Sequence, residues 1–224
     1  MFDQLVGLLL IGLGLRNPVT GNVAGETDVV ETRIDERREV RDGLVERRSE
    51  IKESRASFSA QLREKREEAR ENFAEKREEF KERLETIRDE KKQELVERLD
   101  TRMSEVNNKR TNKMSEHLDK MLEILDKLIA RAAEAEANGK DTSSVDSAAT
   151  AAQDTVTAAQ DTVSDQAGKE YVVTITSETG VGKDVKNTMS IMQTDLKEVH
   201  AQVVSAREAV TGAIKALAAI LEGE

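Results

Sequence analysis

An eleven-residue repeat runs through residues 31–107 and restricts the possible folds more than any other feature. The consecutive blocks read ETRIDERREVR, DGLVERRSEIK, ESRASFSAQLR, EKREEARENFA, EKREEFKERLE, TIRDEKKQELV and ERLDTRMSEVN. The tenth position of every block is apolar. Eleven residues in three turns correspond to about 3.67 residues per turn, so an apolar stripe with this period follows a nearly straight α-helix. The repeat therefore predicts a long helix.

The composition extends this expectation to the rest of the chain. Charged residues make up 36% and aromatic residues 2% of the 224 residues, and there is one proline. β-Sheets need more β-branched and aromatic residues than this chain supplies. Disordered chains share the high charge, but they do not require periodic apolar residues. We expect an all-α fold, in which a long hendecad-repeat helix leads into an antiparallel three-helix coiled-coil bundle.

The apolar stripe of the repeat predicts a seam for self-association. The seam residues are Val40, Ile51, Phe58, Leu62, Phe73, Phe80, Leu84 and Leu95. The third position of the blocks is mostly arginine, at residues 33, 55, 66, 77 and 88. One interpretation pairs these arginines with Glu67 and Glu78 of a partner helix. The other is a solvated helix with local pairs such as Glu79–Arg83, worth a few tenths of a kcal/mol each. The phenylalanines favour a weak, specific association.

Apolar residues become denser from about Leu95 onward, which predicts a bundle. The first bundle helix should end at Asn138-Gly139, a typical C-cap pair. Ser143 or Ser144 is expected to cap the next helix. That helix contains AAQDTVT followed by AAQDTVS, and its small residues predict close packing. The predicted small-residue seam is Val145, Ala149, Ala152, Val156, Ala159 and Val163.

The segment 169–181 is predicted to be an extended connector, because a single strand-like run has no partner strand. Tyr171 and Ile175 should be buried in it. The last helix is expected from about Lys183 to Leu221, starting beside Leu99 and Val106. The predicted bundle core includes Leu118, Leu125, Val156, Val163, Leu196, Val203 and Val210.

The first twenty-five residues contain an apolar run, Leu5 to Leu15, followed by small residues. This pattern is typical of a secretory signal peptide, although no Lys or Arg precedes the run. The alternatives are a retained helix that contacts a membrane through residues 4–15, and a short helix in the protein's own core. The predicted domains are 1–25, a charged rod at 26–94, and the bundle at 95–224.

Several chemistries are excluded. The chain has no cysteine and two histidines, too few for a zinc site. The run Gly180-Val-Gly182-Lys183 lacks the residues that complete a phosphate-binding loop. The net charge is −10 without a one-sided basic face, so nucleic acid is not an expected partner. We predict no enzyme, no cofactor, and no catalytic or metal-binding residues.

The stretch ERLDTRMSEVNNKRTNKMSEHLDKMLEILDKLIARA, with ANGKDTSSVD and GKEYVVTITSE after it, resembles a group of helical proteins with predicted export signals from uncultured candidate-phylum bacteria. The resemblance covers about residues 85–224. It implies a helical fold and export from the cell, but no function and no site residues.

The function expected from the sequence is that of a structural or interaction protein of the cell envelope or exterior. Such a protein would act by forming a homo-oligomer or by binding a protein partner through its helical seam. A periplasmic holdase-like chaperone and a membrane-inserting helical protein that uses residues 4–15 remain as alternatives.

Overall fold

A computed structural model describes residues 24–222, and side chains from residue 42 onward except that of Leu44. The chain divides into two units, Met1–Glu39 and Val40–Glu224. The described part of the first unit is the beginning of a helix. Every regular element in the described residues is an α-helix, so the predicted all-α class is confirmed. The predicted signal peptide and the side chain of Val40 lie outside the described residues.

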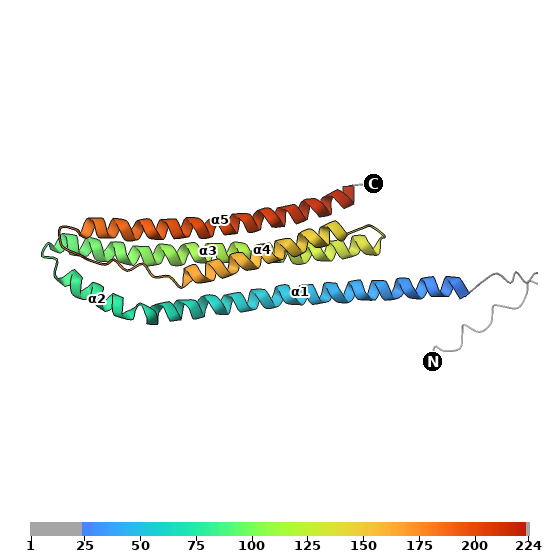
Figure 1. Cartoon of the computed structure of the whole chain (residues 1–224), viewed down its shortest axis with the longest axis horizontal. Helices are drawn as coiled ribbons and strands as arrows, with labels where there is room; N and C mark the ends of the chain where they lie inside the picture. Colours follow the sequence, from blue (N-terminus) through green and yellow to red (C-terminus); the bar gives the residue numbers. More distant parts are fainter. Residues whose placement is uncertain (1–23, 223–224) are drawn as a thin grey trace, which may run out of the picture. The chain divides into compact units, whose positions relative to one another are not determined.

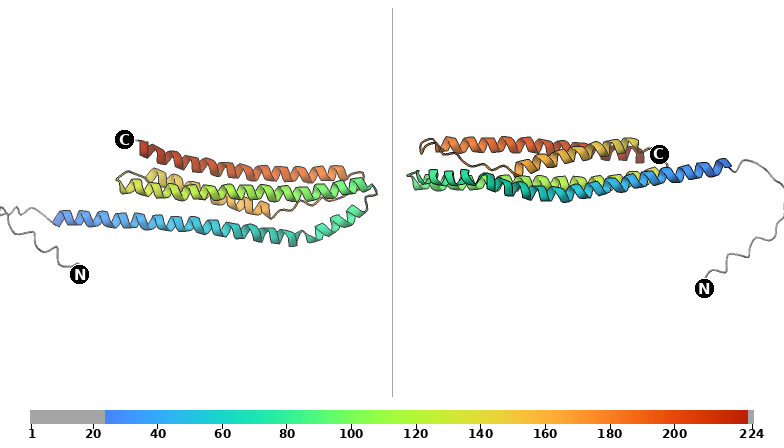
Figure 2. Two further views of the ribbon diagram at one scale, coloured as in Figure 1. Left: turned by 180° about the vertical axis from the view of Figure 1, so that it is seen from behind. Right: turned by 60° about the horizontal axis from the view of Figure 1, so that its bottom comes forward.

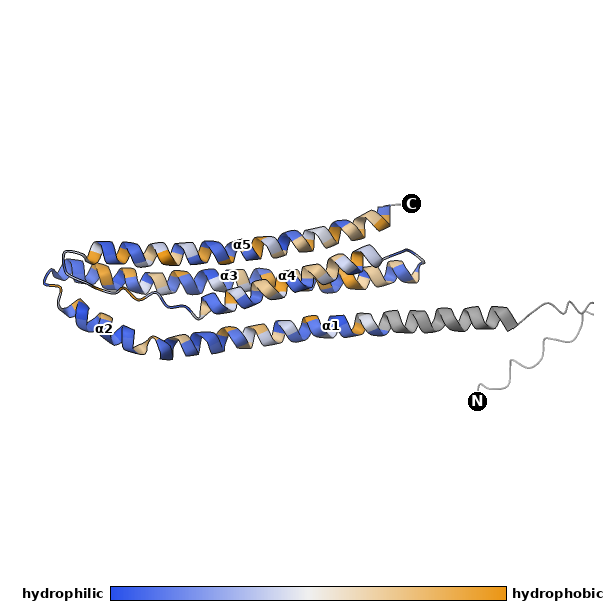
Figure 3. Ribbon diagram, viewed as in Figure 1, coloured by the Kyte–Doolittle hydropathy of each residue, from blue (hydrophilic) through white to orange (hydrophobic). Residues whose placement is uncertain are grey.

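Helix α1 spans Ala24–Asn72, and helix α2 spans Ala74–Glu85 (Figure 1). Phe73 separates them, with φ −102° and ψ 3°. The ammonium group of Lys76 lies 4.9 Å from the centre of the Phe73 ring. Both helices consist mainly of Glu, Arg, Lys and Ala, which have high helix propensity. Figure 3 shows α2 and the described part of α1 as mostly hydrophilic.

The chain reverses after α2, where we expected an unbroken helix. Residues 86–89 are not helical, and helix α3 then spans Glu90–Ala137. Asp89 is its N-cap, because its carboxylate accepts a hydrogen bond from the Lys92 backbone N–H at 3.2 Å. Ile87 is buried and anchors the turn. The charged rod therefore ends before residue 94 and turns back alongside the helix that follows it.

Helix α3 ends where the sequence predicts. Asn138 is its C-cap, and Gly139 adopts φ +86°, the left-handed conformation that favours glycine. Helix α4 spans Ser143–Ala167, and its N-cap is Thr142, one residue before the predicted serines. The Asp141 carboxylate accepts hydrogen bonds from both the backbone N–H and the hydroxyl of Ser143. The Ser143 side chain therefore bonds to a residue that precedes the helix.

Helix α4 packs through its small residues. Within the second unit it lies beside α3 and helix α5, which spans Val181–Glu222 (Figures 1 and 2). The six predicted seam residues of α4 are all buried. Because alanine and valine are small, the α4 backbone can approach both neighbours closely. Lys140 Nζ donates to the Ile220 carbonyl oxygen at 3.0 Å, which places the end of α5 beside the α3–α4 turn.

The segment between α4 and α5 is extended and irregular over residues 169–177. Tyr171 and Ile175 are buried, as predicted, and Val173 is buried with them. These three pack in one cluster with Phe80, Leu84 and Ile87 of the α2 region and with Val181, Val185 and Met192 of α5. The connector thus fills the core beyond the end of α4.

The second buried cluster joins four helices, where we expected three and a projecting rod. Ile51, Phe58 and Leu62 of α1 share it with apolar residues of α3, α4 and α5. Phe58 is 2% exposed, and Ile51 is 1% exposed. The apolar stripe of the repeat is therefore covered by the chain's own helices.

Close packing of α4 can be tested with two neighbouring alanines. Ala152 is 0% exposed, whereas Ala151 is on the exposed face. We expect Ala152→Leu to lower the free energy of unfolding by about 1–3 kcal/mol, because the larger side chain overpacks the core. Ala151→Leu should change it by less than about 0.5 kcal/mol, since alanine and leucine have similar helix propensities. Urea unfolding followed by circular dichroism measures both. Equal effects would contradict close packing at Ala152.

Candidate interaction groove

A groove with a volume of about 510 Å³ lies between α3 and α5. We call it the α3–α5 groove. On α3 it is lined by Leu99, Arg102, Met103, Val106, Arg110 and Met114. On α5 it is lined by Met189, Met192, Gln193, Leu196, Lys197 and His200. No residue of α4 or of the connector lines it.

The floor of the groove is apolar and only partly covered. Met103 and Met192 are buried beneath it. Four further apolar side chains are half-buried and pack against the same cluster. They are Leu99, Val106, Met189 and Leu196. Four of the six methionines of the chain line this one groove. Methionine is flexible and polarizable, so such a floor adapts its shape to different apolar side chains.

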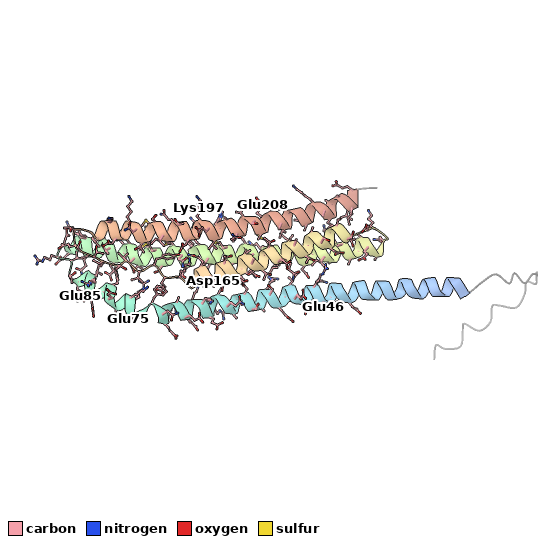
Figure 4. The ribbon with its side chains drawn as sticks, in the orientation of Figure 1. Glu46, Glu75, Glu85, Asp165, Lys197 and Glu208 are labelled. Carbon is pink, nitrogen blue, oxygen red and sulfur yellow. The ribbon has the colours of Figure 1, made fainter. Side chains whose placement is uncertain are left out.

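The rim of the groove is positively charged. Arg102, Arg110 and Lys197 are exposed, and no aspartate or glutamate is among the lining residues. In the described part of the chain, no carboxylate lies within ion-pair distance of any of these three cations. Figure 4 shows Lys197 on α5 with Glu208 further along the same helix, beyond the groove. The adjacent face of α3 carries charges of both signs, from Glu94, Glu97 and Glu105 and from Arg98, Arg102 and Lys109.

Polar contacts fix the position of α5, which forms one wall of the groove, relative to the connector. The Tyr171 hydroxyl donates to Asp195 Oδ2 at 2.8 Å and accepts from Gln166 Nε2 at 2.7 Å. Lys169 Nζ also contacts Asp195 Oδ2 at 3.0 Å. Asn107 Nδ2 donates to the carbonyl oxygens of Gln166 and Lys169 at 3.1 and 2.9 Å. Through these contacts α3, the end of α4, the connector and α5 are joined in one hydrogen-bonded network.

Three arginines at the third position of the repeat, at residues 55, 66 and 77, bind α3. Arg55 Nη2 lies 2.7 Å from Glu123 Oε1, and Arg66 Nη2 lies 2.6 Å from Asn112 Oδ1. Arg77 binds the Asp100 carboxylate. The three α3 partners are eleven and twelve positions apart. Their numbers fall as the arginine numbers rise, so the segment that carries the arginines runs antiparallel to α3. Their partners are in this chain's own α3, where we had considered Glu67 and Glu78 of a partner helix.

Arg77 joins three parts of the second unit. It donates through Nε to Glu170 Oε2 at 2.9 Å and through Nη2 to Ser104 Oγ at 2.8 Å. Asp100 is 1% exposed, and its other carboxylate oxygen accepts from the Val173 backbone N–H at 3.1 Å. Burial raises the pKa of Asp100, and the Arg77 charge and the hydrogen bonds only partly oppose this. The pair therefore fixes the position of α2 and the connector more than it contributes net stability.

Most residues of the predicted self-association seam are covered by this chain. Ile51, Phe58, Leu62, Phe80 and Leu84 are buried, and Phe73 is half-buried at the α1–α2 break. Leu95 lies apart from them and is 44% exposed, whereas its neighbour Val96 is buried. Because α3 starts anew at Glu90, the buried face shifts by one residue relative to the repeat.

Six of the seven residues predicted for the bundle core are buried: Leu118, Leu125, Val156, Val163, Val203 and Val210. Leu196 is half-buried and lines the groove. The sequence interpretation did not predict the groove. The signal available was the concentration of methionines on two helices, together with two cations, Arg110 and Lys197, that have no acidic residue three or four positions away.

Other chemistry is not favoured in the described residues. No helix in residues 24–222 is long and apolar enough to cross a bilayer. No group of three or more His, Asp or Glu residues in this range could hold a metal ion. Comparisons with family models, with curated proteins and with solved structures found no match to this chain. The groove is therefore the candidate site on its geometry alone.

Tyr171 offers a direct test of the polar contacts that hold α5. Burial raises its pKa above the usual value of about 10. Because the unfolded chain loses the phenolic proton at a lower pH than the folded chain, the free energy of unfolding should fall as the pH rises from the unfolded pKa toward the raised folded pKa. The chain has one tyrosine and no tryptophan, so absorbance at 295 nm reports this group alone. We expect ionisation to coincide with loss of helical circular dichroism.

Two controls accompany the Tyr171 titration. In urea the same group should titrate near its usual pKa of about 10. Tyr171→Phe should lose stability less steeply than the wild type in the same alkaline range. Ionisation of Tyr171 near pH 10 in a chain that is still helical would contradict its burial against Asp195.

Proposed function

We propose that this chain is a structural or interaction protein that binds protein helices through the α3–α5 groove. The observation that carries the proposal is the partly covered apolar floor between α3 and α5, rimmed by three cations that form no ion pair with the described residues. A partly uncovered apolar floor between two helices is the kind of groove into which an amphipathic helix can lay its apolar face. A second copy of the chain and a different protein are both occupants that this function admits.

The repeat supports this choice of surface by its own placement. Its apolar residues Ile51, Phe58 and Leu62 on α1 are buried together with residues of α3, α4 and α5, so they are not available for another molecule while α1 stays in place. The groove is formed by the faces of α3 and α5 that α1 does not cover. An interaction protein with this architecture uses the α1 part of its repeat for internal support, whereas the end of the repeat on α3 contributes Leu99, Met103 and Val106 to the groove.

We also propose how the eleven-residue repeat packs against the other helices. The eleven-residue period places the third, sixth and tenth positions on one face of α1, and this face carries both the buried residues and the arginines that bind α3. We infer that hendecad packing is what holds α1 straight along α3. Helices α3, α4 and α5 form the antiparallel coiled-coil core onto which it packs.

The proposed location is the cell envelope or exterior. It rests on the apolar run and small-residue stretch within residues 1–25 and on the resemblance to exported helical proteins. A groove that binds other helices is consistent with a role in an assembly at that location.

The interaction function can be tested by selecting binders from a displayed library of helical peptides of mixed charge. We expect the wild-type chain to enrich binders and Leu196→Glu to lose them, because a carboxylate on the groove floor must be desolvated on binding. Ile191→Glu is the matched control, since Ile191 is 58% exposed on α5 outside the groove. Gln193→Trp places a large side chain in the groove from an exposed position, and it should also lose the binders. It replaces Leu196→Glu in the test if that variant does not fold.

Sedimentation velocity over a wide range of concentrations completes this test. A wild-type dimer that Leu196→Glu converts to a monomer identifies a second copy as the occupant. The function is contradicted if the chain sediments as a monomer throughout and the library yields no peptide that distinguishes the wild type from the groove variants.

The proposed location has its own test. When the full chain is produced in a bacterial host that exports proteins, we expect a shortened N-terminus in the exported fraction, cleaved after the small residues near position 24. Mass spectrometry of the intact protein measures the cleavage point. Replacing Leu8, Leu9 and Leu10 by asparagine should block export, because the apolar segment of a signal peptide is then interrupted. An intact N-terminus found only in the cytosol would contradict this location.

A further inference from the structure

We propose that the natural occupant of the α3–α5 groove is an amphipathic α-helix of another protein, with acidic residues flanking its apolar face. This inference rests on the proposed function and goes beyond it by naming the chemistry of the partner. Three properties of the groove carry it: the charge of its rim, the nature of its floor and its length.

The charge of the rim selects an acidic partner. Residues 98–113 of α3 contain five Lys or Arg and two Asp or Glu, in a chain whose net charge is −10. One of the two acids, Asp100, is buried and bound to Arg77, so it does not face the groove. On α5, Asp195 is bound to Tyr171 and Lys169. The second acid, Glu105, lies three residues after Arg102 but is not among the lining residues, and neither is Glu198 on α5. The charged side chains that line the groove are Arg102, Arg110 and Lys197, so carboxylates of a partner would be attracted to it.

The floor selects apolar anchors of varied shape. Met189 and Leu196 from α5 face Leu99 and Val106 from α3, with Met103 and Met192 beneath them. Methionine-rich surfaces can repack around different side chains, which is how promiscuous helix-binding grooves accommodate their targets. A partner needs leucine, methionine or similar residues spaced three and four positions apart.

The length of the groove fits a helix of about four turns. The lining residues of α3 run from Leu99 to Met114. At about 1.5 Å per residue this stretch is roughly 22 Å long, which equals a partner helix of about fifteen residues. An extended peptide would leave its backbone N–H and C=O groups unpaired over the apolar floor, because the groove walls are helices without free sheet edges. A helix satisfies these groups internally.

Two synthetic sixteen-residue peptides test the inference. They share one apolar face of leucine and methionine and differ only in their flanking residues, which are glutamate in one and lysine in the other. Fluorescence anisotropy measures their binding to the full chain. We expect the glutamate peptide to bind at least about tenfold more tightly at low salt, with the difference shrinking in high salt.

Charge reversal at the rim provides the matched comparison. In the double variant Arg102→Glu, Lys197→Glu, the preference should reverse toward the lysine peptide. Arg131→Glu combined with Lys215→Glu makes the same charge change on the same two helices outside the groove, and both side chains are exposed. This control should keep the wild-type preference. All four substituted positions are exposed, and circular dichroism verifies that each variant is folded.

The outcomes separate the partner class from the proposed function. Equal binding of the two peptides, or tighter binding of the lysine peptide, overturns the acidic-helix inference but leaves the groove as an interaction site. The inference also fails if phosphatidylglycerol vesicles bind the chain in an Arg102- and Lys197-dependent manner while the glutamate peptide does not. If neither peptide binds and the displayed library yields no groove-dependent binder, the proposed function fails as well.

A label placed in the groove locates the bound peptide. Because the chain has no cysteine, Gln193→Cys can be modified at a single position with an environment-sensitive dye. We expect the glutamate peptide to shield this dye from a soluble quencher. The same dye at Ala158→Cys, an exposed position on α4, should be unaffected. Shielding at Ala158 without shielding at Gln193 would place the peptide elsewhere and overturn the inference.

Discussion

The contact between α1 and α3 determines which surfaces the rest of the second unit can offer. Arginines at successive third positions of the repeat reach Glu123, Asn112 and Asp100, at nearly equal intervals along α3. Ile51, which precedes the first of these arginines, and Phe58 and Leu62, which lie between the first two, enter the shared core. Exposed ion pairs contribute little each, so the buried apolar residues supply most of the stability, and the arginines set the register.

The unequal lengths of the helices create the groove. Helix α4 has 25 residues, whereas α3 has 48 and α5 has 42. Beyond the end of α4, the core is completed by connector residues such as Val173 and by α2 residues such as Phe80. An extended segment contributes fewer side chains per unit length of core than a helix does. Part of the apolar surface between α3 and α5 is therefore left half-covered, and Leu99, Val106, Met189 and Leu196 line it.

Buried polar groups position this region more than they stabilise it. Burial raises the pKa values of both Asp100 and Tyr171, which shows that the environment disfavours their charged forms. Each is nevertheless held by several hydrogen bonds, from Arg77 and the Val173 N–H in one case and from Gln166 to Tyr171 in the other. Groups that are costly to bury and fully engaged allow one arrangement of the connector, because any shift would leave them unpaired.

The sequence by itself determined the helical class, the C-cap at Asn138 and Gly139, the small-residue seam of α4 and the buried side chains of the connector. These features are local or periodic: helix propensity, a left-handed glycine and the spacing of apolar residues act within a few turns. The burial of Ala152 and Val156, for example, follows from the period of their own helix.

The tertiary structure alone decided what covers the repeat. The period that places Phe58 on a seam is the same for a second molecule and for α3 of the same chain, so periodicity could not choose between them. The reversal at residues 86–89 made the choice, because it brings α1 alongside α3. The sequence carried one sign of this reversal in Asp89, a favourable N-cap residue followed by Glu90 in the first turn. A single cap residue is a weaker signal than a repeat that continues through it. The groove followed from that arrangement, since it depends on where α4 ends relative to its two longer neighbours.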